Sequence, residues 1–293
     1  MIEVLKFFVI QLITILSLMF ILSSGIGFLR TYISQQRIKE MLVMKSGFKA
    51  YLVASGLGAI TPFSPKDSIR LFSSFLKSGV PLGISLSFLI SSPIINEYII
   101  ILLIIFFGLK VTIIYLFLGI LISSIAGIIL GKCNLEKYIQ NKFAGEVDLN
   151  FRCSIRHKIN KGLKEGLAII KKMGILIFFG LILNSIIENY VSPLAITNIV
   201  EFFGFLGVPV AILIGIPIPG TGAALIPVAV ALFEKGIPLG TALGFLIAVV
   251  GLSVPKAFKL RKVIEKKLIF YFFLVLGLAT IILCYILNLI VSI

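Results

Sequence analysis

The chain has 293 residues, of which 59% are hydrophobic and 13% are charged. A soluble domain carries about 45–50% apolar and about 25% charged residues, so this composition excludes a chain whose whole surface faces water. The formal net charge is +15, but 20 of the 27 Lys and Arg residues lie in the ranges 30–45, 132–172 and 255–267, between apolar segments. Basic loops of this kind mark the cytoplasmic side of a membrane protein. We therefore expect the lipid bilayer, and not nucleic acid, to be the partner of this charge.

Residue patterns that carry chemistry are scarce. The three cysteines form no CxxC pair, and a single histidine does not suggest a zinc site. No P-loop, HExxH or GxSxG pattern occurs. The sequence therefore predicts no metal, no cofactor and no catalytic residues, and we expect a protein that is not an enzyme.

Six apolar segments are long enough to cross the ~30 Å of hydrocarbon in a bilayer. They are 7–29, 81–107, 111–131, 168–190, 237–254 and 267–290. The first is longer than the apolar region of a signal peptide, which has about 7–15 residues, so we expect it to stay on the chain as a membrane helix.

Two further apolar regions, 46–78 and 203–234, are interrupted by proline, glycine and polar residues at 61–67 and 216–222. The arms on either side have roughly 12–17 residues each, which is short for a full crossing. Irregular backbone inside a bilayer survives only where protein or a watery cavity satisfies its hydrogen bonds. The pattern predicts two re-entrant helical hairpins, with two short full crossings as the alternative.

The chain repeats itself with an offset of 157 residues, at which 75–90 matches 232–247 in 8 of 16 positions. The matching pairs include Gly79/Gly236, Pro81/Pro238, Gly83/Gly240 and Phe88/Phe245, and the same offset pairs Gly58 with Gly215 and Pro62 with Pro219. Both interruptions therefore occupy equivalent places in two halves. The predicted organisation is a first transmembrane repeat over 1–131, a basic cytoplasmic linker over 132–165 and a second transmembrane repeat over 166–293.

Charge indicates how the halves are oriented. The stretch 30–45 has a net charge of +3, whereas its counterpart 188–204 has −2. An inverted arrangement places the strongly basic stretches inside and the acidic one outside, with both termini outside. The parallel alternative requires 81–107 to cross twice, with about 13 residues per crossing. The predicted fold class is an all-α integral membrane protein, a polytopic helical bundle with two inverted-topology repeats that each contain a re-entrant hairpin.

The first interruption carries the richest set of polar residues. Ser64 suits an N-cap and Pro65 the first helical position, and Asp67 can complete a capping box. A half-helix that starts here aims free N–H groups and partial positive charge at the midplane. Lys66 and Arg70 lie one turn apart on the same face. The pattern favours contact with an anionic or oxygen-rich solute, with internal pairing of these charges as the alternative.

Other polar residues lie in the middle of segment 81–107 and at the second interruption. Pro93 removes a helix hydrogen bond, and Glu97 suggests either a proton or cation relay or a partner for the bases of the first hairpin. Glycines in the second interruption allow close approach of the main chain to a ligand. The predicted solute-binding residues are Ser64, Lys66, Asp67, Arg70, Asn96, Glu97, Pro219, Gly220, Thr221 and Gly222.

Several short motifs in the two halves form a recognisable pattern. They are 61–63 (TPF), 77–83 (KSGVPLG) and 88–96 (FLISSPIIN) in the first half, and 236–240 (GIPLG) and 245–247 (FLI) in the second. On these motifs the sequence resembles the YraQ-like predicted permease family, which includes organoarsenical efflux permeases. The arsenical-type members carry Cys-x-Cys directly after the Pro-Phe, where this chain has Ser64 and Lys66. A soft arsenical requires thiolates, so the resemblance implies a permease and does not indicate a particular cargo.

The prediction is thus a secondary transporter of the cell membrane that moves a small, anionic or polar solute, bound between the two hairpin tips near the midplane. A channel is one alternative. A membrane protein like the gate-domain proteins of the nucleoside-recognition group is another. The expected partners are a small-molecule or ion substrate and the lipid bilayer, and a homo-oligomer is left open.

Overall fold

A computed structural model describes residues 2–30, 47–60, 65–139, 155–190, 202–218 and 222–291, together with positions 42, 192, 198 and 200. Within these residues the regular elements are helices, and the single β contact is an isolated bridge between Ile139 and Ile264. The helices are α1 Ile2–Arg30, α3 Phe48–Ile60, α4 Pro65–Lys77, α5 Leu82–Ile94, α6 Glu97–Lys132, η1 Leu135–Tyr138, α7 Ile155–Tyr190, η2 Gly204–Leu206, α9 Gly207–Gly215, α10 Gly222–Glu234, α11 Leu239–Gly251, α12 Val254–Leu260 and α13 Lys266–Val291.

The expected membrane class is confirmed by the length and apolar character of the helices. Four candidate spans occur in the described residues: Phe8–Gly25, Phe107–Lys132, Leu239–Leu260 and Lys266–Val291. Large apolar side chains on several of these spans, among them Ile13, Phe117 and Phe270, are exposed on the outside of the bundle. Exposure of this kind is costly in water and favourable in lipid. The chain is therefore an all-α, multi-pass membrane protein.

Two predicted segments differ in detail from the structure. Segment 81–107 is divided into α5 and the first part of α6, because Pro93 weakens the last turn of α5 and Ile95 then leaves helical geometry. Helix α7 begins at Ile155, so the last residues of the predicted linker 132–165 form its first turns. Within α6 a sharp kink lies at Gly108, whose φ of 72° suits glycine, in the gap expected between two crossings.

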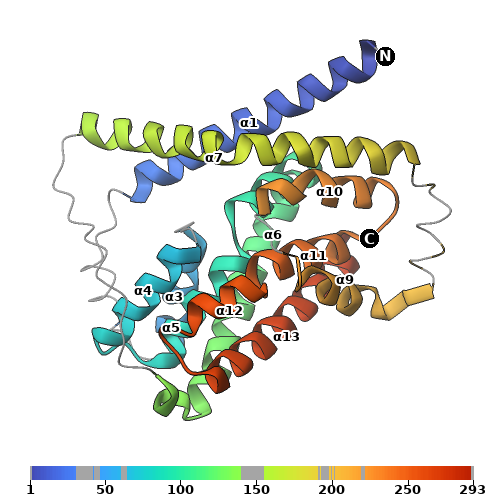
Figure 1. The fold of residues 1–293 in the computed structure, drawn as a ribbon. Coiled ribbons are helices and arrows are strands. Elements are labelled where there is room, and N and C mark those ends of the chain that lie inside the picture. The colour runs from blue at the N-terminus through green and yellow to red at the C-terminus, as the bar shows by residue number, and fades with distance from the viewer. Residues whose placement is uncertain are drawn as a thin grey trace.

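Helices α1 and α7 form an antiparallel pair that lies across the bundle, beside α10 (Figure 1). Early residues of α1 meet late residues of α7, since the ring centroids of Phe8 and Phe178 are 5.5 Å apart. The other end of the contact is tight: a Cβ on Gly162 would lie 2.6 Å from the carbonyl oxygen of Ser24. Glycine at this position therefore lets the two backbones approach closely.

The bundle core forms around α5 and α11, which pack against α6 and α13, respectively. The arms of the first interrupted region, α3 and α4, both pack against α5. They share with it a core of large side chains, in which the rings of Phe75 and Phe88 meet edge to face at 5.1 Å. Each arm is therefore held by the crossing helix that follows it in the sequence.

The offset of 157 residues recurs in the helix bounds. Adding 157 to the bounds of α4 gives those of α10, and adding it to the bounds of α5 gives those of α11. The close contacts correspond as well. A Cβ on Gly58 would lie 2.6 Å from the carbonyl oxygen of Phe88, and a Cβ on Gly215 would lie 2.8 Å from that of Phe245. Equivalent residues thus make equivalent contacts in the two halves.

These contacts predict opposite effects for two glycines in α3. Gly58→Ala should lower the free energy of unfolding by about 1–3 kcal/mol, because the new methyl group overlaps backbone atoms of α5. Gly56→Ala should be neutral or stabilise by about 0.5–1 kcal/mol, because nothing lies within 4 Å of its Cβ and alanine favours a helix. Thermal unfolding of the purified variants measures both. Equal stability of the two variants would contradict the packing of α3 on α5.

Candidate functional site

The side chain of Asn96 holds the break between α5 and α6. Asn96 has extended geometry, with φ −120° and ψ 159°, and its Oδ1 accepts a hydrogen bond of 3.0 Å from the backbone N–H of Ile99. Its Nδ2 donates to the carbonyl oxygen of Pro93 over 3.1 Å. The side chain is 7% exposed. Asn96 therefore caps the new helix and satisfies a carbonyl near the end of the old one.

A tyrosine hydroxyl makes a further hydrogen bond at this break. The hydroxyl of Tyr115, which lies after the kink of α6, donates to the carbonyl oxygen of Ile94 at the end of α5. Both residues are fully buried. Non-helical backbone at this depth requires such partners, since lipid offers none.

Serine hydroxyls join the first interrupted region to α5. Ser68 in α4 lies 2.9 Å from Ser92 in α5, oxygen to oxygen. Ser91 donates to the carbonyl oxygen of Ser55 in α3 over 2.7 Å, and the hydroxyls of Ser55 and Ser124 are 3.1 Å apart. At the offset of 157 the second half has Leu225, Val249, Ala248, Ile212 and Ile281 in the places of these five serines. The hydroxyl groups are therefore a feature of the first half.

A second break separates α11 from α12, at Ser253, which is the counterpart of Asn96 at the offset of 157. Ser253 is extended, with φ −66° and ψ 144°, and is 8% exposed. The two breaks lie against each other, because a Cβ on Gly251 would lie only 2.9 Å from the Cβ of Pro93. The C-terminal ends of α5 and α11 thus meet inside the bundle.

Lys256 is a buried polar residue that sequence reasoning missed. It lies one turn into α12, where we counted it among the cytoplasmic bases of 255–267, yet its side chain is only 5% exposed. Its Nζ lies 5.9 Å from the ring centroid of Phe272 in α13. The repeat offers a signal for it, since Lys256 follows Ser253 by the same three positions that separate Ile99 from Asn96.

The structure places only some of the predicted site residues. Ser64, Pro219, Gly220 and Thr221 lie outside the described residues, and so do the side chains of Lys66, Asp67 and Glu97. Lys66 and Asp67 belong to the first turn of α4, Glu97 is the first residue of α6 and Gly222 is the first of α10. Arg70 is exposed on α4. The bond between Ser68 and Ser92 brings the start of α4 toward the region that contains Asn96.

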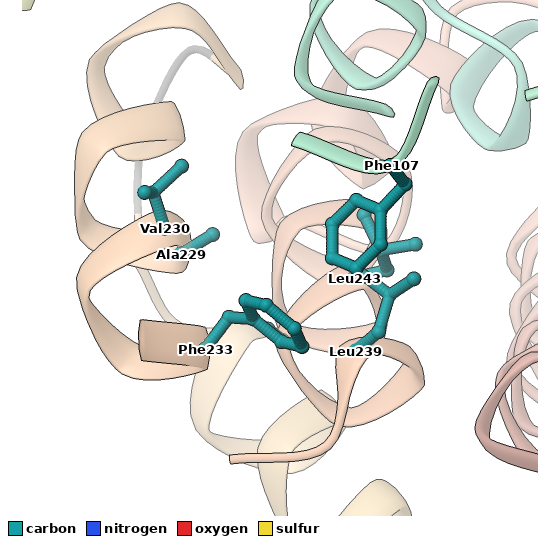
Figure 2. Close-up of a pocket in the computed structure, with 7 residues that line it drawn as sticks. Phe107, Ala229, Val230, Phe233, Leu239 and Leu243 are labelled. Carbon is teal, nitrogen blue, oxygen red and sulfur yellow. The ribbon is translucent and has the colours of Figure 1, made fainter. Parts of the chain in front are cut away.

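A small cavity lies away from the two helix breaks, between α10, α11 and the end of the first part of α6. It holds about 10 Å³ and is lined by seven apolar residues. Phe107 and Phe233 face each other across it (Figure 2), with ring centroids 4.7 Å apart. A volume near that of one water molecule, with no polar partner, does not suit a solute. This space is a packing gap.

A bundle of apolar helices with buried helix breaks is typical of a multi-pass membrane protein. Residues 1–289 match the model of a family described as "Predicted permease". The chain belongs to this permease family, which confirms the resemblance seen in its motifs. A search of curated proteins found no match, and neither did a search of solved structures.

Proposed function

We propose that this permease is a secondary transporter of the cell membrane, with two inverted-topology repeats and both termini outside. A small anionic or polar solute binds near the midplane, between the tips of two re-entrant hairpins. The meeting of the two buried helix breaks carries this proposal, since Pro93 of the first half touches Gly251 of the second. Discontinuous helices at a repeat interface are where transporters bind their substrates.

Two contacts support inversion of the halves. Helices α1 and α7 begin the two halves and pack antiparallel, with Phe8 against Phe178. Helices α5 and α11 occupy equivalent places and meet at their C-terminal ends. Equivalent helices that run in opposite directions are what a two-fold axis in the membrane plane requires. Parallel halves would instead point these helices the same way.

The polar groups at the start of α4 and near the end of α5 favour a solute that carries oxygen atoms or a negative charge. Helix α4 begins at Pro65, so its free N–H groups and Lys66 lie at its start, next to the first interruption. The hydroxyls of Ser68 and Ser92 lie between this start and the break at Asn96. Hydroxyl groups and free N–H groups together suit a solute that both accepts and donates hydrogen bonds.

A crosslink tests whether the tips meet. In a background in which the three native cysteines are replaced by alanine, Ser64→Cys with Thr221→Cys should be bridged by a short thiol crosslinker. The control pair, Ser64→Cys with Lys110→Cys, should not be bridged, because Lys110 lies near the kink between two crossings. The readout is the mobility of a chain cleaved between the two cysteines. Failure to bridge the first pair, with both cysteines reactive toward a monofunctional reagent, would rule out the site between the tips.

A further inference from the structure

Lys256 is a base in an unusual place for a membrane permease. It belongs to the candidate span Leu239–Leu260, and its side chain is 95% shielded from solvent. Its neighbours in the turn after α12, Arg261 and Lys262, are exposed, as expected for cytoplasmic bases. Lys256 therefore differs from the other bases of 255–267 in its surroundings.

A buried ammonium group requires compensation. Within the described part of the chain no carboxylate forms an ion pair with Lys256, and the ring of Phe272 is the partner that the structure gives its Nζ. One aromatic face offsets only part of the cost of removing a lysine from water. Ionisable residues inside a membrane usually face a partner or a substrate pathway.

The position of Lys256 relates it to the first half of the site. It lies one turn after Ser253, the counterpart of Asn96, at the place where the two breaks meet. Helix α12 packs against α4, the helix that begins with Pro65 and Lys66 (Figure 1). Side chains on a helix point toward its N-terminus, so the side chain of Lys256 leans back toward the break.

The repeat shows how the second half differs from the first half at this junction. The place of Phe272 is taken in the first half by Tyr115, whose hydroxyl bonds the last carbonyl of α5. Phe272 has no hydroxyl, and an ammonium group lies near its ring instead. The second half thus brings a lysine amino group to the junction where the first half brings a phenol hydroxyl.

We propose that Lys256 is a solute-binding residue supplied by the second half, whose ammonium group pairs with an anionic oxygen of the cargo where the two helix breaks meet. This rests on the proposed function, because it requires a solute site at the junction. It adds the class of the bound group, a carboxylate or oxyanion, and places one of its ligands on α12. The rival role is structural, in which the charge only offsets the partial negative charge at the end of α11.

The test uses thermal unfolding of the purified full chain with phosphate, sulfate and acetate as probes. At least one probe should raise the melting temperature of the unmodified protein and of Lys262→Gln, a control that removes an exposed charge in the turn after α12. Lys256→Gln should unfold at the same temperature as the unmodified protein without probe. Its apparent affinity for the probe should be weaker by about tenfold or more. Lys256→Arg should retain binding, with a changed order of preference among the three anions.

Three other outcomes of this experiment would contradict the proposal. If Lys256→Gln keeps the full response while Lys66→Gln loses it, this inference is wrong and the proposed function stands. If none of the three anions stabilises the unmodified protein, the anionic class of the cargo fails with it. If Lys256→Gln unfolds at a lower temperature without any probe and Lys256→Arg restores it, Lys256 has the structural role.

Discussion

Replacing Lys66 with glutamine should abolish the stabilisation that an anion gives to the purified permease, while the protein still inserts and folds. Glutamine keeps the length and polarity of the side chain and removes its charge. A hydrogen bond to a charged group is worth about 1.5–3 kcal/mol, so affinity should fall roughly tenfold to a hundredfold. The measurement is the shift in melting temperature with phosphate, sulfate or acetate.

This expected loss of anion binding follows from the position of Lys66 in α4. It is the second residue of α4, after Pro65, so its Cα lies among N–H groups that have no partner within the helix. The next turn is tied to α5 by the bond between Ser68 and Ser92. An anion at this end would meet a helix N-terminus and an ammonium group together.

A double variant separates this site from a structural ion pair. If Lys66 serves only to neutralise Glu97, Lys66→Gln should impair folding and Lys66→Gln with Glu97→Gln should restore it. A double variant that also regains the response to anions would end the idea that Lys66 binds the cargo. Ser78→Ala, near the end of α4, serves as a control that changes a hydroxyl outside the proposed site.

Much of this architecture could be predicted from residue types. Pro93 is expected to remove a helix hydrogen bond within segment 81–107, and the structure shows a full break there, with Asn96 as the N-cap of the next helix. Glycines repeated at 157 residues, such as Gly58 and Gly215, predict equivalent places in the two halves, and the structure adds that each lies close to a backbone carbonyl of the following crossing helix. Local features of this kind can be predicted from the sequence because they depend on residues that are close together in the chain.

The parts that sequence missed depend on tertiary contacts. Lys256 looked like one of six bases at a cytoplasmic surface. Only the packing of α12 against α4, and the place of the Lys256 side chain near Phe272 of α13, show that it is buried. The contact between Pro93 and Gly251 joins halves that are far apart in the sequence. The serine network was also invisible, because Ser55, Ser91 and Ser124 come from three separate helices.

Cysteine labelling should give an all-or-none answer about orientation. An impermeant thiol reagent, added to intact cells after the native thiols are masked, should label Lys110→Cys and should leave Lys142→Cys unlabelled until the cells are opened. Lys110 lies just after the kink of α6, and the apolar helix that follows it reaches Lys132. An α-helix rises about 1.5 Å per residue, so this helix is long enough to span the bilayer. We therefore expect its two ends to lie on opposite sides.

The charge pattern decides which side is which. The stretch 132–172 has ten bases and four acids, whereas 188–204 has two acids and no base. Positive loops stay in the cytoplasm, so we expect Lys142 inside and Lys110 outside. The antiparallel pair of α1 and α7 agrees with this arrangement, because α7 then leaves the cytoplasm in the direction opposite to that of α1. Labelling of Lys142→Cys from outside, with Lys110→Cys protected, would reverse the orientation, and labelling of both from outside would contradict a crossing between them.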